Sequence, residues 1–408
     1  MAKKSLKWIA LLGGVTLGTA SVAVAQDGKA VLDALVKKGV LTTEEAAQIT
    51  KDAKPSTYAM PGSSSVTKLQ INGRVQARYD NFTTDDELDG LLGDIPTSGN
   101  FFMRRVRLGV KAEFGPDFEG VINYDFLATG ALDVAYVRYK GFDDHTIDVG
   151  FKKVNFGVEE NTSSASLKAI ERSPVTRYFV ESNNGRRLGG GSRRMGIFTD
   201  GTAGNVFYGA AVTNIERQSD PGFGGRSGNP GNSGVALWAN GGLKGKFDNG
   251  SYTVGAALGF LPEQVENGVL VNDSLLVTSL YSTFTVGSFS LLGEVLWSDN
   301  DAGAGSNAYG FTLQPSVALS KQLELVARLS YLDTDGRNVS VTDVIPSTNS
   351  ARENFDSMYE VYAGFNYLFA KDNVKFSAGV VYAKFEDGAT TGGDADVLGL
   401  RTQMQVSF

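Results

Sequence analysis

The sequence contains no cysteine and only one histidine, His145. Without cysteine there can be no disulfide, no thiolate zinc site, no cysteine nucleophile and no lipid-modified N-terminal cysteine. Most metal sites and most general-base catalysis use histidine, so we expect neither an enzyme nor a metal or cofactor. Proline is also scarce, at 10 residues, which excludes a collagen-like or Pro/Gly-rich chain. The net charge of -7 argues against a nucleic-acid partner.

Long apolar runs are missing after residue 25, so no transmembrane helix is expected there. The first 25 residues have the features of a secretory signal peptide. Lysines lie at positions 3, 4 and 7, an apolar stretch begins at Trp8, and Ala23-Val24-Ala25 forms an A-x-A cleavage site. We therefore expect export and cleavage near Ala25, which removes three lysines and takes the net charge from -7 to -10.

Residues 26–54 are predicted to form a short helical segment in the periplasm. Val31, Leu32, Leu35 and Val36 recur at helical spacing, and Thr42 with Glu45 forms a capping box. The apolar stripe could dock on a partner, join a trimeric bundle, anchor the protein to the cell envelope, or simply pack locally. Residues 55–65 form a linker.

What is abundant is glycine, at 50 residues, together with 24 Phe and 15 Tyr, and from residue 66 the apolar residues follow period two. In 323–331, for example, Leu323, Leu325, Ala327, Leu329 and Tyr331 share one face. Sixteen strands of this kind are predicted, and many are longer than the mean soluble strand of about 5–6 residues. Their ranges are 66–82, 101–114, 118–128, 131–140, 146–156, 193–200, 204–214, 234–246, 250–260, 274–286, 288–297, 308–319, 322–332, 357–369, 373–385 and 397–408.

The connections between these strands alternate between short turns and long loops. Tight turns are predicted at Gly115-Pro116-Asp117, Asp200-Gly201, Asp248-Asn249-Gly250, Gly287 and Lys371-Asp372-Asn373, and long loops at 83–100, 157–192, 215–233, 261–273, 298–307, 333–356 and 386–396. An even number of long strands with this asymmetry is typical of an outer-membrane barrel. The fold class is therefore all-β, with residues 66–408 forming a 16-stranded antiparallel transmembrane β-barrel. The terminal Phe408 is expected to be the signal for the outer-membrane assembly machinery.

The inner face of this barrel is predicted to be basic. In strand 101–114 the apolar residues Val106, Leu108 and Val110 belong to the lipid face. A charge on that face costs roughly 2–4 kcal/mol at mid-membrane, so the alternating basic residues must face the lumen. This parity places Arg74, Arg78, Arg105, Arg107, Lys111, Arg138 and Lys140 inside.

The longest loop, 157–192, is a candidate to fold inward and narrow the pore. Residues 168–194 contain seven basic residues, Lys168, Arg172, Arg177, Arg186, Arg187, Arg193 and Arg194, but only two acidic ones, Glu171 and Glu181. Arginine binds oxyanions bidentately and never deprotonates, so such a constriction would select anions. Alternatively, these arginines pair with lumen carboxylates such as Asp125, Glu159 and Glu160, or with lipopolysaccharide phosphates.

The sequence resembles the phosphate-selective porin O and P family at RRVRLGVKAEFG (104–115), INYDF (122–126), DVAYVRYKGF (133–142), VGFKKVNFGVEENTSS (149–164) and IERS (170–173). The resemblance implies a homotrimeric, sixteen-stranded porin with an inward loop and an arginine-rich lumen that passes phosphate-like anions. It carries over Arg104, Arg105, Arg107, Arg138, Lys152, Lys153 and Arg172 as motif positions. One departure is the loop 261–273, which has no Lys or Arg where phosphate-selective members have further arginines.

Rival functions have less support in the sequence. A barrel enzyme needs histidine-based nucleophile activation or paired acids, and the single His145 lies in a predicted periplasmic turn. Residues 26–65 are too short for the plug of a gated transporter. The remaining alternative is a general or weakly selective diffusion porin. The expected partners are small anions, outer-membrane lipid and lipopolysaccharide, the assembly machinery and two further copies of the chain.

Overall fold

The computed structural model describes residues 36–37, 42–43, 66–86, 99–127, 132–181, 187–191, 193–215, 234–266, 269–300, 307–336, 339–345, 354–388 and 393–408. The predicted signal peptide 1–25, the linker 55–65, Arg186 and nearly all of the predicted helical segment 26–54 lie outside these residues. The chain divides into two compact units, Met1–Ala59 and Met60–Phe408, and the second contains the sheet. Within the described ranges, no helix is both long enough and apolar enough to cross a bilayer.

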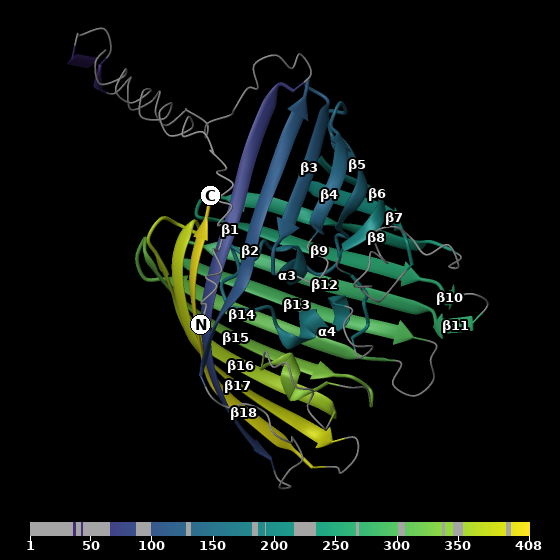
Figure 1. Cartoon of the computed structure of the whole chain (residues 1–408), viewed down its shortest axis with the longest axis vertical. Coiled ribbons are helices and arrows are strands. Elements are labelled where there is room, and N and C mark those ends of the chain that lie inside the picture. The colour runs from purple at the N-terminus through teal and green to yellow at the C-terminus, as the bar shows by residue number, and fades with distance from the viewer. Residues whose placement is uncertain are drawn as a thin grey trace, which may run out of the picture. The chain divides into compact units, whose positions relative to one another are not determined.

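Sixteen strands of the described residues close into one antiparallel barrel, which confirms the predicted fold class (Figure 1). Each strand pairs with its neighbours along the chain, and the first pairs with the last. The barrel strands are β1 (Lys68–Asp86), β2 (Asn100–Phe114), β3 (Phe118–Asp125), β4 (Leu132–Tyr139), β5 (His145–Lys153), β6 (Arg193–Ala203), β7 (Val206–Thr213), β8 (Ala236–Phe247), β9 (Gly250–Leu261), β12 (Leu275–Val286), β13 (Phe289–Asn300), β14 (Tyr309–Ala318), β15 (Leu323–Asp333), β16 (Phe355–Leu368), β17 (Val374–Gly388) and β18 (Ala395–Ser407).

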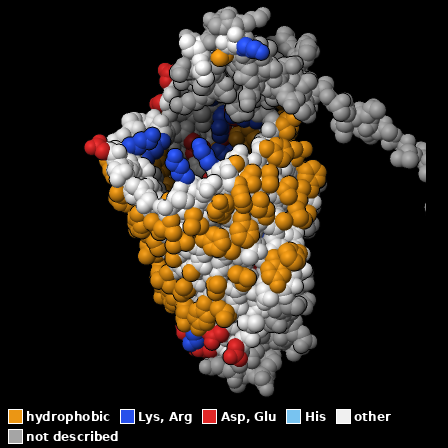
Figure 2. All heavy atoms as spheres, turned by 90° about the vertical axis from the view of Figure 1, so that its left-hand side faces the viewer, with side chains coloured by type: hydrophobic (Ala, Val, Ile, Leu, Met, Phe, Trp, Pro, Cys, Tyr) orange, Lys and Arg blue, Asp and Glu red, His pale blue; other side chains and the backbone are white. Residues whose placement is uncertain are grey.

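The outer wall is hydrophobic and the inner wall is polar, as the alternation requires. In β15, Leu325 and Leu329 are each 42% exposed, whereas Arg328 and Ser330 are buried. Figure 2 shows the outer wall as a broad hydrophobic surface, with basic side chains inside the opening above it. Large apolar side chains exposed in such numbers fit a wall that faces lipid rather than water.

Short turns and long loops alternate around the barrel, with two differences from the sequence prediction. The predicted turn at Asp200-Gly201 is wrong, because both residues lie in β6 and the turn comes at 204–205. Asp200 instead points inward, where it accepts hydrogen bonds from Lys152 and Asn155. The predicted loop 261–273 contains a small hairpin of β10 (Gln264–Glu266) and β11 (Val269–Asn272), separate from the barrel.

The barrel closes where the C-terminus meets β1. Backbone hydrogen bonds join Gly73 to Phe408 in both directions, at 2.9 and 3.1 Å. The Phe408 ring lies over Gly73, where an added Cβ would come within 2.3 Å of the ring. An alanine at position 73 would therefore displace the terminal aromatic ring from this closing contact.

The connection between β5 and β6 lies inside the barrel. It carries α3 (Val158–Asn161) and α4 (Pro174–Val180), and α4 contacts β13, β14 and β15 (Figure 1). Ser173 caps α4 by accepting the Thr176 N–H, and Pro174 occupies its first turn. A second connection, between β15 and β16, contributes the short 3-10 helix η1 (Val341–Asp343), whose residues are also largely buried. We call the described residues of this connection, 154–181 and 187–191, the inward loop.

Candidate functional site

The inward loop is held at the start of α3 by a carboxylate of the barrel wall. Glu294 of β13 accepts hydrogen bonds from the backbone N–H groups of Val158 and Glu159, at 2.8 and 3.3 Å. Ser279 of β12 donates a third, at 2.7 Å. Gly157, with φ of 79°, turns the chain into this position. The free N–H groups at the helix start are thus satisfied by a side chain of the wall.

The loop is also held by a buried arginine of β15, whose charge is opposite to that of Glu294. Arg328 binds Glu360 through Nε at 2.9 Å and Nη2 at 2.6 Å. Its Nη1 lies 3.3 Å from Glu159 Oε1 and donates to the Glu171 carbonyl at 2.5 Å. Glu159 also accepts hydrogen bonds from Ser173, so the clamp reaches both helices of the loop.

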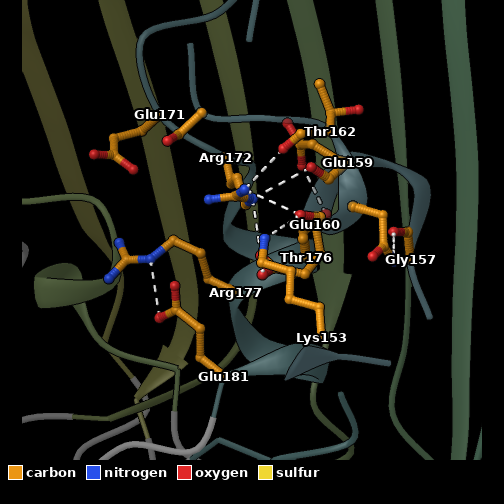
Figure 3. A network of polar contacts seen from close by, with 12 residues as sticks. Lys153, Gly157, Glu159, Glu160, Thr162, Glu171, Arg172, Thr176, Arg177 and Glu181 are labelled. Carbon is orange, nitrogen blue, oxygen red and sulfur yellow. Dashed lines mark hydrogen bonds and ion pairs between the residues drawn. The ribbon is translucent and has the colours of Figure 1, made fainter. Parts of the chain in front are cut away.

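Arg172 of the loop and Lys153, the last residue of β5, both form ion pairs with Glu160 (Figure 3). Arg172 Nε lies 2.8 Å from Glu160 Oε2, and Lys153 Nζ lies 2.6 Å from Oε1. Burial alone would raise the pKa of Glu160, but these two cations outweigh burial and lower it to about 2. Arg172 also donates to the carbonyl oxygens of Glu160 and Thr162, so much of its hydrogen-bonding capacity serves the loop itself.

The loop is tied to β1 and β2 through Glu171. Arg104 Nε and Arg78 Nη2 lie 2.5 and 2.7 Å from Glu171 Oε1. Burial opposes ionisation of this carboxyl, but the two guanidinium groups hold its pKa well below the usual range. Figure 3 shows Glu171 beside Arg172 on the same stretch of the loop.

An irregularity in β2 places two consecutive arginines on the inner face. The register against β1 passes from Gln76↔Arg105 to Ala77↔Met103, so Arg104 is an extra residue. A bulge of this kind breaks the strict alternation of side chains. Arg104 reaches Glu171, and Arg105 donates to Gln76 at 2.9 Å. Alternation alone would have sent one of the two arginines to the lipid face.

A cavity of about 510 Å³ lies between the inward loop and the inner wall of β1–β6. Eight basic and four acidic side chains are among the residues that line it. The basic ones are Arg74, Arg104, Arg105, Arg107, Lys152, Lys153, Arg172 and Arg193, and the acidic ones are Asp125, Asp133, Glu160 and Glu181. Of the fourteen predicted anion-binding residues, seven therefore meet at one place.

Six of the eight basic groups are matched by carboxylates. The pairs are Arg104 with Glu171, Arg107 with Asp125 and Asp133, Arg193 with Asp133, Lys152 with Asp148 and Asp200, and Lys153 and Arg172 with Glu160. Arg74 and Arg105 differ. Arg74 donates to Ser163 and Ser164 and Arg105 to Gln76, and among the described residues neither has a carboxylate partner.

The other predicted basic residues that the structure describes lie outside this cavity. Lys111, Arg138 and Lys140 pair with Glu113, Glu119 or Asp148 on the walls of β2–β5. Arg78 pairs with Glu171 and is not among the residues that line the cavity. Arg177 and Arg187 join the inward loop to η1, where Arg177 donates to the Asp343 carbonyl at 2.6 Å and Arg187 Nη2 lies 2.6 Å from Asp343 Oδ1.

Sequence reasoning did not single out Arg328, Glu294 or Asp133. Parity alone places Arg328 on the inner face of 323–331, so this residue could have been found from the sequence. The pairing of Asp133 with Arg107 and Arg193 joins three strands, so it could not have been found from the sequence.

Comparison with known proteins agrees with this barrel. Residues 69–252 match the model of the family described as phosphate-selective porin O and P. These residues belong to that family. The closed barrel with its apolar wall and this match make the chain an outer-membrane porin, and the resemblance found in the sequence is confirmed. No curated protein sequence matches the chain.

Several solved structures share the fold at low identity. The anion-selective porin from Comamonas acidovorans has 12% identity and a TM-score of 0.55, covering 83% of this chain and 99% of its own. The outer membrane channel DcaP of Acinetobacter baumannii has 13% identity and a TM-score of 0.56, covering 85% and 99%. The trimer form of in-vitro folded OmpT of Vibrio cholerae has 11% identity and a TM-score of 0.51, covering 84% and 100%.

Proposed function

We propose that this porin is a passive diffusion channel that favours small anions, phosphate and related oxyanions among them. The observation that carries the proposal is the pair Arg74 and Arg105, which line the cavity and have no carboxylate partner among the described residues. A buried cation without a counter-charge is costly, and Arg105 is only 5% exposed. An anion passing through the cavity supplies the missing charge, so the pair attracts anions and repels cations.

A second candidate is a general or weakly selective porin, whose helical segment 26–54 would also attach it to the cell envelope. The six matched basic groups of the cavity favour it, because their charges are largely cancelled before a solute arrives. The two candidates differ in the size of the selectivity and not in the pathway.

The reversal potential across a planar bilayer under a potassium chloride gradient tests the proposal. We expect a potential of the sign that chloride permeation produces. Arg105→Ala should reduce it, whereas Lys384→Ala at the barrel rim, where Lys384 pairs with Glu386 and Asp394, should leave it unchanged. A cation-selective channel would refute the proposal. If millimolar phosphate fails to inhibit the chloride current, only the phosphate preference is lost.

We also propose the assembly and export steps that the sequence suggests. The protein would be exported with cleavage near Ala25, inserted with Phe408 as the assembly signal, and assembled as a homotrimer in contact with lipid and lipopolysaccharide. The OmpT structure of similar fold is described as a trimer, which supports the last point. The mass of the mature protein and light scattering of the detergent-solubilised channel test cleavage and trimerisation, and removal of Phe408 should lower the yield of inserted barrel.

A further inference from the structure

The same cavity presents carboxylates with spare hydrogen-bonding capacity. Asp125 accepts Arg107 Nε at Oδ2, 2.7 Å away, and the Leu127 N–H at Oδ1, 3.3 Å away. Asp133 accepts a hydrogen bond from Arg107 Nη1 at Oδ2, 3.1 Å away, and its Oδ1 lies 2.5 Å from Arg193 Nη2. A carboxylate offers about four acceptor sites. Each of these oxygens can therefore accept one more donor from a solute.

One of the cations without a carboxylate partner and one of these carboxylates lie in the same row of the wall. Arg74 of β1 is opposite Arg107 of β2, which is opposite Asp125 of β3. Neighbouring strands are about 4.7–4.9 Å apart, so the first and last positions of this row are about 10 Å apart along the wall. The cavity of about 510 Å³ is in the range of roughly 300–1,000 Å³ typical of sites for small organic molecules.

A wall that presents both arginines and carboxylates binds two kinds of anion differently. An anion that only accepts hydrogen bonds, such as sulfate or chloride, finds donors at Arg74 and Arg105 but only repulsion at Asp125 and Asp133. An anion that also carries hydroxyl groups can place its charged group on the arginines and donate its hydroxyls to the carboxylates. The second kind satisfies both ends of the row.

We propose that the cavity favours hydroxylated organic anions, represented by phosphate monoesters of short polyols, over anions that only accept hydrogen bonds. This inference rests on the proposed anion channel, because Arg74 and Arg105 supply the anion affinity in both.

Two phosphate esters separate the hydroxyl contribution from charge and size. Glycerol 3-phosphate and propyl phosphate each have a three-carbon chain, and at about pH 8 both are dianions, since the second phosphate pKa is about 6. Only the first carries free hydroxyls. We expect glycerol 3-phosphate to block the chloride current at a concentration about tenfold lower, as two added hydrogen bonds of ordinary strength would give.

The variant Asp133→Ala tests the origin of this preference. It removes one of the two acceptor carboxylates and leaves Arg107 paired with Asp125 alone, so both esters should block more strongly, but their ratio should fall from about tenfold to about threefold. The matched control is Glu324→Ala, which removes a carboxylate paired with Lys168 at 2.5 Å and outside the residues lining the cavity. That variant should keep the wild-type ratio.

The possible outcomes distinguish this inference from the proposed function. A wild-type channel that is anion-selective but is blocked equally by both esters refutes only the hydroxyl preference. A ratio that keeps its full wild-type value in Asp133→Ala also refutes only the hydroxyl preference. A cation-selective reversal potential refutes the proposed function and this inference together.

Discussion

Replacing Arg328 by methionine is expected to release the inward loop from the barrel wall. Arg328, Glu159 and Glu360 are buried, with side chains no more than 2% exposed. Methionine has a similar length but no charge, so two carboxylates are left facing each other without their shared cation. Glu360 belongs to the rigid wall, whereas Glu159 can reach water if the loop moves away.

The size of the effect follows from burial. Removing one partner of a buried ion pair costs about 3–5 kcal/mol, because the remaining charge is left without compensation. At about 1.4 kcal/mol per factor of ten, the equilibrium between attached and detached loop shifts by roughly a hundredfold to several thousandfold. The sheet should remain intact, because the backbone pairing of β15 with β14 and β16 does not involve this side chain.

Single-channel recording is the assay. A detached loop no longer divides the lumen, so Arg328→Met should raise the mean conductance, increase the current noise and weaken anion selectivity. Arg328→Lys keeps the charge and should restore part of the wild-type behaviour. Combining Arg328→Met with Glu159→Gln and Glu360→Gln removes the uncompensated charges and should lower the current noise again.

Lys384→Met provides the matched control. Lys384 also pairs with two carboxylates, Glu386 and Asp394, but its side chain is 28% exposed, so water replaces the lost contacts. If Arg328→Met forms a folded barrel whose conductance, noise and selectivity equal those of wild type, the clamp does not position the loop and the reasoning is wrong.

Three further changes test other parts of the structure. Gly73→Ala should displace the Phe408 ring and lower the yield of folded, heat-modifiable barrel on gels. The control Gly293→Ala should keep the wild-type yield, because its new Cβ would meet nothing closer than 3.7 Å. Equal yields of the two variants would contradict this prediction. Because Arg172 and Lys153 lower the pKa of Glu160 from 4.5 to about 2, its ion pairs persist above pH 4.5 and are lost as the pH falls toward 2. Conductance should therefore change in that acid range, and a change that survives in Glu160→Gln would assign it elsewhere. Asp343→Asn breaks its buried pair with Arg187 and should speed hydrogen exchange at the Val344 and Ile345 amides, which donate to the Val341 carbonyl; unchanged protection would show that the pair does not hold this segment.

The barrel itself could be predicted from the sequence alone. The alternation in 323–331 and its counterparts reflects a sheet with one face in lipid, where a misplaced charge is costly, so the inward or outward direction of most side chains follows from parity. Strand number and the alternation of turns and loops were correct for the same reason. The turn at Asp200-Gly201 was misplaced because Asp and Gly are common turn residues, whereas here Asp200 binds Lys152 inside the barrel.

Only the tertiary structure decided which basic residues keep their charge available. Arg104, Arg105 and Arg107 belong to one segment of the sequence, yet Arg104 meets Glu171 from the inward loop and Arg107 meets Asp133 from β4. Arg105 meets no carboxylate among the described residues, because in the register of β1 and β2 it lies opposite Gln76 and donates to it. Alternation along a strand predicts which face of the sheet a side chain occupies. Its ionic partner belongs to a segment that is distant in the sequence, so the ion pairs of the lumen follow only from the closed barrel.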